Sequence, residues 1–242
     1  MQALDTDIGR LLLHYYHALL EKFGPRSWWP AETPFEVCVG AVLTQNTAWK
    51  NVVKAIDNLK ESGMLNPLTL SGTPLDRIAD VIRPSGYYNV KAKRLRNFVD
   101  HLVEEYEGDL DRLFSLPAGE LRMELLSING VGKETADSII LYAACKPIFV
   151  VDAYTRRLVF RHGLMEEPTD YDAIQDFFHR NLPREVDLFN DFHAQIVAVG
   201  HHYCRKTPRC AECPLNRFPG DAGAKQGNMN ILRNFGSKWS LA

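Results

Sequence analysis

The fold is decided by a stretch near the middle of the chain, Leu126-Ser127-Ile128-Asn129-Gly130-Val131-Gly132-Lys133-Glu134-Thr135-Ala136-Asp137. Apolar residues at helical spacing stop near Leu126 and resume near Lys133, so a short turn joins two helices. Gly130 and Gly132 can take positive φ at little cost, which suits a tight hairpin. The second helix begins with backbone N–H groups that have no partner in the helix, and such a start favours an anion such as phosphate.

Composition sets broad limits on the protein. The chain has 242 residues, 45% of them hydrophobic, and a net charge of −2. It is long enough for one large or two small domains with a real core. It contains no apolar run that would span a bilayer and no basic region followed by an apolar one at its start, so we expect a protein of the cytoplasm or nucleoid.

Helical periodicity predicts an all-α fold. Only residues 147–151 read as extended, and we interpret them as a linker that leads to Asp152. Proline and glycine separate the helical segments. Apolar residues at three- and four-residue spacing predict helices over 8–23, 35–59, 89–106, 121–126, 134–144, 153–162, 171–181 and 186–203.

The hairpin and the segment Val151-Asp152-Ala153-Tyr154-Thr155-Arg156-Arg157 together resemble the helix-hairpin-helix DNA glycosylases of the endonuclease III superfamily. The resemblance implies two helical lobes with a DNA-binding cleft between them. It places a central domain at 34–146, a second domain at 1–33 plus 147–220, and a tail at 221–242. It also implies a monomer whose partner is double-stranded DNA containing a damaged base.

Asp152 is the candidate catalytic carboxylate. An N-glycosidic bond breaks through an oxocarbenium-like sugar. A nearby carboxylate stabilises the positive charge on this sugar and can orient the water molecule that attacks it. Aspartate at this place is also a good helix N-cap ahead of Ala153, and the two roles are compatible. The resemblance places Glu134 in the catalytic site with Asp152, where it lines the pocket for the base.

The hairpin decides between two kinds of glycosylase. In bifunctional members of the superfamily a lysine two residues after the second glycine forms a Schiff base with the sugar; here that residue is Glu134. Lys133 is adjacent, but one helical residue is a rotation of about 100°, so its amine is expected to face the DNA backbone. We therefore predict an enzyme that is monofunctional, or at most a weak lyase, and whose hairpin residues Gly130, Val131, Gly132 and Lys133 bind DNA.

Two further segments match the superfamily. Gly40-Ala41-Val42-Leu43-Thr44-Gln45-Asn46-Thr47 resembles the segment that inserts an amide side chain into the gap left by a flipped base, a side chain called the wedge below. Gln45 and Asn46 are both candidates. Arg83-Pro84-Ser85-Gly86-Tyr87-Tyr88-Asn89-Val90-Lys91 resembles the upstream hairpin, in which Lys91 would meet a phosphate. Asn89 is also an ordinary N-cap candidate.

Tryptophans indicate the class of damaged base. Trp28 and Trp29 precede a proline, and Trp49 follows Gln45-Asn46-Thr47 closely. In the bacterial 3-methyladenine glycosylase branch, aromatic residues at such places line the base pocket. Alkylated purines such as 3-methyladenine are cationic and stack well on aromatic faces, and their glycosidic bond is already labile. The alternative is that these tryptophans belong to the core.

Three of the five cysteines form a cluster late in the chain, at Cys204, Cys210 and Cys213. They resemble the [4Fe–4S] signature of the superfamily, but Pro219 stands where the fourth cysteine belongs, and four thiolates are the usual ligands. A non-cysteine ligand (His201, His202 or Asp221), zinc with one of those, or no metal all remain open. The tail after Phe218 matches nothing in the family.

Two other functions remain open. One is a bifunctional glycosylase and lyase for oxidised pyrimidines, which requires Lys133 to act as the nucleophile. The other is a non-catalytic helix-hairpin-helix module that only binds DNA. Asp152 argues against the second, because a pure binding module needs no acid at that position.

Overall fold

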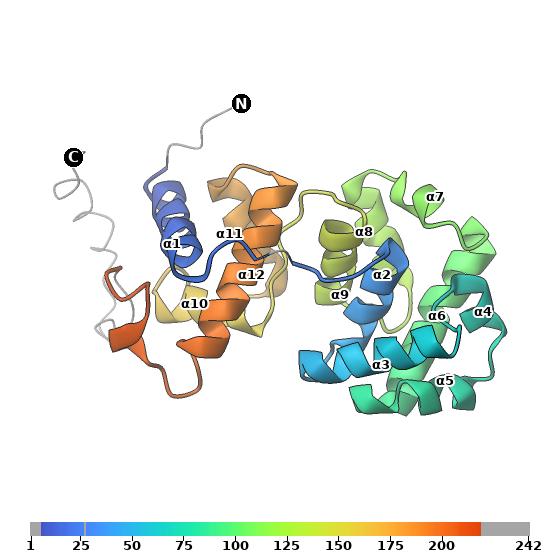
Figure 1. The fold of residues 1–242 in the computed structure, drawn as a ribbon. Coiled ribbons are helices and arrows are strands. Elements are labelled where there is room, and N and C mark those ends of the chain that lie inside the picture. The colour runs from blue at the N-terminus through green and yellow to red at the C-terminus, as the bar shows by residue number, and fades with distance from the viewer. Residues whose placement is uncertain (1–5, 27, 219–242) are drawn as a thin grey trace. The chain divides into compact units, whose positions relative to one another are not determined.

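The computed structural model describes residues 6–26 and 28–218. This part of the chain is helical and contains no strand, so the all-α prediction is confirmed (Figure 1). Contacts divide the chain into two compact units, one formed by Trp29–Ile148 and the other by Met1–Trp28 with Phe149–Ala242. No helix among the described residues is both long and apolar enough to cross a membrane.

The unit of Trp29–Ile148 is built around the almost wholly buried helix α2 and the long helix α6, which packs against α2, α4 and α5. Thr33 caps α2, with Pro34 in the first turn, where a missing N–H costs nothing. The elements of this unit are α2 (Pro34–Leu43), α3 (Trp49–Glu61), α4 (Pro67–Gly72), α5 (Leu75–Val81), η1 (Arg83–Ser85), α6 (Tyr88–Tyr106), α7 (Leu110–Phe114), α8 (Ala118–Ser127), α9 (Lys133–Ser138) and the π-helical turn η2 (Ile139–Ala143).

The other unit packs α12 against α1 and α10. Its elements are α1 (Asp7–Phe23), α10 (Ala153–Arg161), α11 (Tyr171–Asn181), α12 (Val186–His202) and the short turn η3 (Cys210–Glu212). Phe149 stacks on Phe178 of α11 at 3.9 Å between ring centroids. Both rings are fully buried, together with Phe189 and Phe192 of α12. Aromatic packing around Phe149 therefore fixes the path of the chain from this residue to the start of α10.

Two predicted helices differ from the structure. The helix expected over 35–59 is interrupted after Leu43, where the Thr44 hydroxyl bonds to the Gly40 carbonyl at 2.6 Å and Asn46 is left-handed. The apolar spacing continues through the break because α2 is buried on nearly all sides and α3 buries one side. The helix expected over 134–144 changes from α to π geometry at Ile139.

The short helices α4, α5 and α7 were not predicted. None exceeds two turns, so each is too short for apolar spacing to be recognised. Asn66 ahead of Pro67 and Asp109 ahead of Leu110 are cap signals that could have located two of them.

Candidate active site

The hairpin turn joins α8 to α9 in the unit of Trp29–Ile148. The N–H of Val131 donates to the carbonyl of Ile128 at 3.0 Å, and the Val131 side chain is buried. Gly130 has φ +100°, whereas Gly132 has φ −92°, so only the first glycine uses the left-handed freedom expected of both. Gly132 and Lys133 are exposed at the start of α9.

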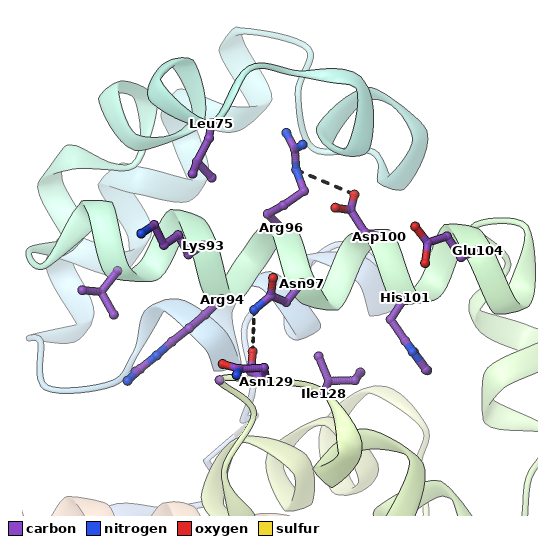
Figure 2. Close-up of a pocket in the computed structure, with 12 residues that line it drawn as sticks. Leu75, Lys93, Arg94, Arg96, Asn97, Asp100, His101, Glu104, Ile128 and Asn129 are labelled. Atoms are coloured by element: carbon purple, nitrogen blue, oxygen red, sulfur yellow. Dashed lines mark hydrogen bonds and ion pairs between the residues drawn. The ribbon is translucent and has the colours of Figure 1, made fainter.

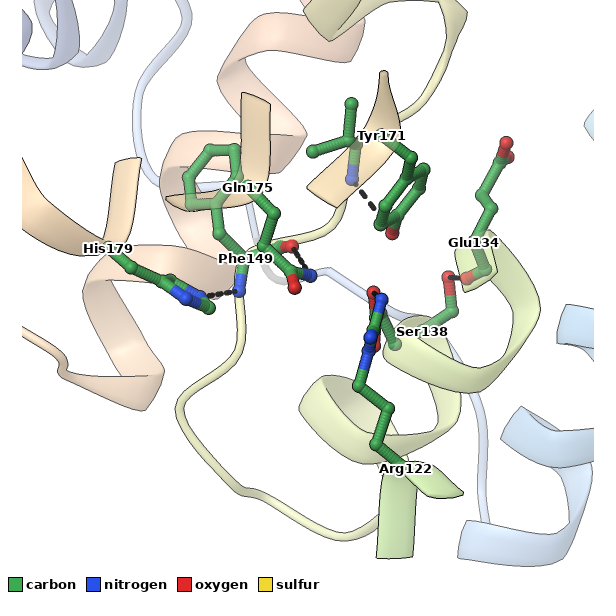
Figure 3. A network of polar contacts seen from close by, with 9 residues as sticks. Arg122, Glu134, Ser138, Phe149, Tyr171, Gln175 and His179 are labelled. Atoms are coloured by element: carbon green, nitrogen blue, oxygen red, sulfur yellow. Dashed lines mark hydrogen bonds and ion pairs between the residues drawn. The ribbon is translucent and has the colours of Figure 1, made fainter. Parts of the chain in front are cut away.

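An ion pair holds the two helices of the hairpin together. Arg122 of α8 donates to Asp137 of α9 through Nε at 2.7 Å and through Nη2 at 3.2 Å. The Asp137 side chain is completely buried, and Figure 3 shows Arg122 reaching across from α8. A bidentate contact fixes direction as well as distance, so it sets how α9 leaves the turn.

The structure separates the two wedge candidates. Gln45 points its side chain to the hairpin: its Nε2 donates to Thr135 Oγ1 of α9 at 2.8 Å, and its Oε1 accepts from Arg94 of α6. Asn46 is exposed and left-handed, with φ +53°. Among the two, Gln45 is therefore the side chain that lies with the hairpin.

The structure buries Lys91, which the sequence predicts to contact a phosphate. Its side chain is only 1% exposed. The ammonium donates to the carbonyls of Leu43 and Ser85, each at 2.7 Å, and burial with the nearby Arg94 charge lowers the pKa of Lys91 to about 8. Lys91 therefore ties the end of α2 to η1 inside the protein, directly before the segment that carries Gln45.

Two of the three predicted pocket tryptophans meet in an aromatic cluster. The rings of Trp29 and Trp49 pack edge to face at 4.9 Å, and Trp29 also contacts Tyr142 of η2 at 5.3 Å. The Trp29 ring lies against Gly40 of α2, where a Cβ would come within 3.1 Å of it. Tyr142 was not predicted as a member of this cluster, although it lies about two helical turns after Glu134 in the same predicted helix. Trp28 belongs to the other unit and is half-buried.

Asp152 stands at the start of α10, in the unit that contains Phe149–Ala242. The extended linker before it is held by side chains of α11: Phe149 donates to His179 Nε2 at 2.9 Å and accepts from Gln175 Nε2 at 2.7 Å, while Val151 donates to Tyr171 Oη at 3.3 Å (Figure 3). Residues 147–151 form neither a helix nor a strand, and side chains of α11 bond the backbone of Phe149 and Val151.

Both expected roles of Asp152 are compatible with its geometry. Its Oδ1 accepts from the N–H of Thr155 at 2.7 Å and caps α10. Its Oδ2 lies 3.8 Å from Nε2 of His193 on α12, and the carboxyl is 13% exposed. Burial lowers the pKa of His193, an effect that the Asp152 charge partly offsets. His193 was not predicted as a site residue, because only the packing of α12 brings it to Asp152.

A close helix crossing supports this carboxylate. A Cβ at Gly200 of α12 would lie 2.3 Å from the Tyr154 ring of α10, and Arg157 donates to the Gly200 carbonyl at 3.2 Å. Glycine at this position therefore lets α10 and α12 approach each other. The other catalytic candidate, Glu134, is exposed in the first turn of α9, and its carbonyl accepts from Ser138 at 2.7 Å.

The cysteine cluster does not fit a four-thiolate metal centre. Within residues 6–26 and 28–218, no group of three or more histidine, cysteine or acidic residues could hold a metal ion. Arg161 instead organises the turn by donating to Cys204 Sγ at 3.4 Å and to the Arg205 carbonyl at 2.6 Å. Pro219 and Asp221 lie outside the described residues, as does the tail.

Comparisons with known proteins agree with this arrangement. Residues 39–184 match the family model described as HhH-GPD superfamily base excision DNA repair protein. A putative DNA repair glycosylase of Methanocaldococcus jannaschii is 46% identical over 210 residues, which are 86% of this chain and 95% of that protein. The chain belongs to the HhH-GPD superfamily of base excision DNA repair proteins. It is a DNA N-glycosylase.

Solved structures show the same fold. The crystal structure of H. pylori 3-methyladenine DNA glycosylase bound to 1,N6-ethenoadenine has a TM-score of 0.70 and 31% identity, over 81% of this chain and 98% of that one. An endonuclease III–DNA complex has a TM-score of 0.76 and 22% identity, over 88% of this chain and 95% of that one.

Proposed function

We propose that this protein is a monofunctional glycosylase that removes an alkylated purine, such as 3-methyladenine, from double-stranded DNA. The observation that carries the proposal is the cluster of Trp29, Trp49 and Tyr142. A methylated purine is an electron-poor cation, and aromatic faces attract it by stacking and cation–π contact. The solved relative at 31% identity, a 3-methyladenine DNA glycosylase bound to 1,N6-ethenoadenine, supports the same class of substrate.

The chemistry then falls to Asp152. One oxygen remains in the helix cap while Oδ2 stabilises positive charge on the sugar and orients a water molecule. A cationic base is a good leaving group, so little protonation of the base is needed. Glu134 stands where a Schiff-base lysine would be required for strand cleavage, which supports a hydrolytic reaction without a covalent intermediate. In this role the protein acts on damaged DNA of the nucleoid.

A second candidate is a bifunctional glycosylase and lyase for oxidised pyrimidines. The exposed position of Lys133 at the start of α9, next to Glu134, favours it. Endonuclease III of Sulfolobus acidocaldarius is 29% identical to this chain over 186 residues, 76% of this chain and 80% of that protein. In this mechanism the Lys133 amine would attack the sugar and displace the base.

The deciding experiment compares base release from methylated DNA and from thymine-glycol DNA, each with borohydride present. Free 3-methyladenine without a trapped protein–DNA adduct supports our proposal. An adduct on the oxidised substrate that disappears with Lys133→Gln would establish the second candidate. Duplex binding without release of either base, unchanged in Asp152→Asn, would mean a non-catalytic DNA-binding module.

A further inference from the structure

Gln45 is held at both ends of its amide in the protein without DNA. Its Oε1 accepts a hydrogen bond from Arg94 of α6, and its Nε2 donates to Thr135 Oγ1 of α9 at 2.8 Å. A free glutamine side chain samples many rotamers, and two contacts on opposite sides restrict it to few. The proposed wedge is therefore already positioned beside the hairpin before any base is flipped.

Arg94 joins this wedge to the hairpin turn. A Cβ at Gly130 would lie 2.4 Å from Arg94 Cγ, so the aliphatic part of Arg94 lies directly on the turn. One helical turn later, Asn97 donates to the Asn129 carbonyl at 2.8 Å. Figure 2 shows Arg94 and Asn97 extending from α6 on the side where Asn129 lies.

The Arg94 guanidinium carries a charge that the protein does not neutralise. Within the part of the chain that the structure describes, its hydrogen bond to Gln45 is its only polar contact. Arg96, on the same helix, instead pairs with Asp100 and donates to the carbonyls of Leu70 and Thr73. Arg94 lines an open groove of about 800 Å³ between α6 and the hairpin turn, where a DNA phosphate could reach it.

We propose that Arg94 is a positioning residue that holds Gln45 at the hairpin in the free protein and releases it when a DNA phosphate reaches the turn. A guanidinium binds a phosphate oxygen more strongly than a neutral amide oxygen, because both partners are then charged. Arg94 therefore releases Gln45 only after the protein has bound the DNA backbone at this turn. This inference rests on the proposed function, since only an enzyme that flips a base needs a wedge.

The first test observes Gln45 directly. Side-chain amide signals of Gln45 are followed by NMR in the full-length protein, with and without a duplex carrying a tetrahydrofuran abasic analogue. We expect the signals to move when the duplex binds, to be displaced already in free Arg94→Met, and to stay unchanged in free Lys93→Met. Lys93 is an exposed neighbour of equal charge, which controls for electrostatics. Unchanged Gln45 signals in Arg94→Met would overturn the proposal.

The second test separates positioning from a general structural role. Arg94→Met should slow single-turnover base release about tenfold and should lower the slope of log K against log salt by about one. In a Gln45→Ala background the same change should slow release no further. An equal loss in both backgrounds would show that Arg94 acts independently of Gln45. Arg94→Lys, which keeps the charge, should restore the salt slope while Gln45 stays displaced.

The two proposals can fail separately. If the wild-type protein releases no alkylated purine but Gln45 responds to the duplex and to Arg94→Met as described, the substrate proposal fails and the role of Arg94 stands. If 3-methyladenine is released normally by Arg94→Met, the role of Arg94 fails and the proposed function stands.

Discussion

Asp152 Oδ2 lies 3.8 Å from His193 Nε2, so a buried imidazole faces the oxygen of the candidate catalytic carboxylate that does not cap α10. The two residues come from different helices, α10 and α12, which pack against each other. The position of this carboxylate is therefore determined by a helix cap on one side and by a helix crossing on the other.

Asp152→Asn should separate catalysis from folding. Asparagine caps a helix as well as aspartate, so the free energy of unfolding should change by less than about 0.5 kcal/mol. Base release should fall on the order of 100-fold, because the charge that stabilises the sugar cation is lost. Asp152→Ala should release the base as slowly as Asp152→Asn, and its free energy of unfolding should be lower by a further ~1 kcal/mol. Single-turnover rates and urea unfolding measure the two effects, and an active Asp152→Asn would contradict the assignment.

His193 should make the protein less stable in mild acid. Burial lowers its pKa in the folded state, so the unfolded chain takes up this proton first as pH falls below about 6.5. The free energy of unfolding should decrease with pH in that window, by at most about 1.4 kcal/mol per pH unit, until pH reaches the lowered pKa.

Urea unfolding between pH 7 and 5 measures this dependence on His193. His193→Gln should flatten it. Asp152→Asn should extend it to lower pH, because the carboxylate that partly raises the histidine pKa is then gone. The same slope in His193→Gln as in the wild type would assign the effect to other groups.

Arg122→Met should destabilise the hairpin by about 3 to 5 kcal/mol, because it leaves the completely buried Asp137 carboxylate without its bidentate partner. Adding Asp137→Asn should restore part of the loss, since a neutral amide is less costly to bury than a carboxylate that has lost its Arg122 contact. Thermal and urea unfolding of the single and double variants test this. Equal stability of the two variants would show that the uncompensated charge is not the cause.

The two hairpin glycines should respond differently to alanine. Gly130→Ala places a Cβ at φ +100° and 2.4 Å from Arg94 Cγ, so we expect a loss of about 1 to 3 kcal/mol and weaker duplex binding. Gly132 has φ −92° and open space where a Cβ would lie, so Gly132→Ala should lose less than about 1 kcal/mol. Similar losses in both variants would argue against strain at Gly130.

A matched pair tests the crossing of α10 and α12. Gly200→Ala would bring a Cβ to 2.3 Å from the Tyr154 ring, and the expected cost is about 1 to 3 kcal/mol with reduced base release, because Asp152 moves with α10. Gly119, in the first turn of α8, has open space around it, so Gly119→Ala should stabilise by about 0.5 kcal/mol. Calorimetric unfolding distinguishes the two variants. Wild-type stability in Gly200→Ala would contradict the close packing of α10 against α12 at this glycine.

Several features of the fold and the site were predictable from sequence because they are local. Helices of at least two turns have enough apolar repeats to be recognised, and the glycine turn at Gly130 and the cap at Asp152 depend on neighbouring residues alone. Residues 147–151 form neither a helix nor a strand, in agreement with the predicted linker before Asp152. Short helices such as α4 and α7 were missed because fewer than two turns contain too few repeats.

By itself, the sequence determined an all-α protein with a glycine hairpin and a helix capped by Asp152. Only the tertiary structure decided which distant side chains meet. It buries Lys91 between two carbonyls, joins Tyr142 to Trp29, places His193 beside Asp152 and connects Arg94 with Gln45. The physical reason is that periodicity and caps are set by residues within a few positions, whereas these contacts arise when helices far apart in the chain pack together.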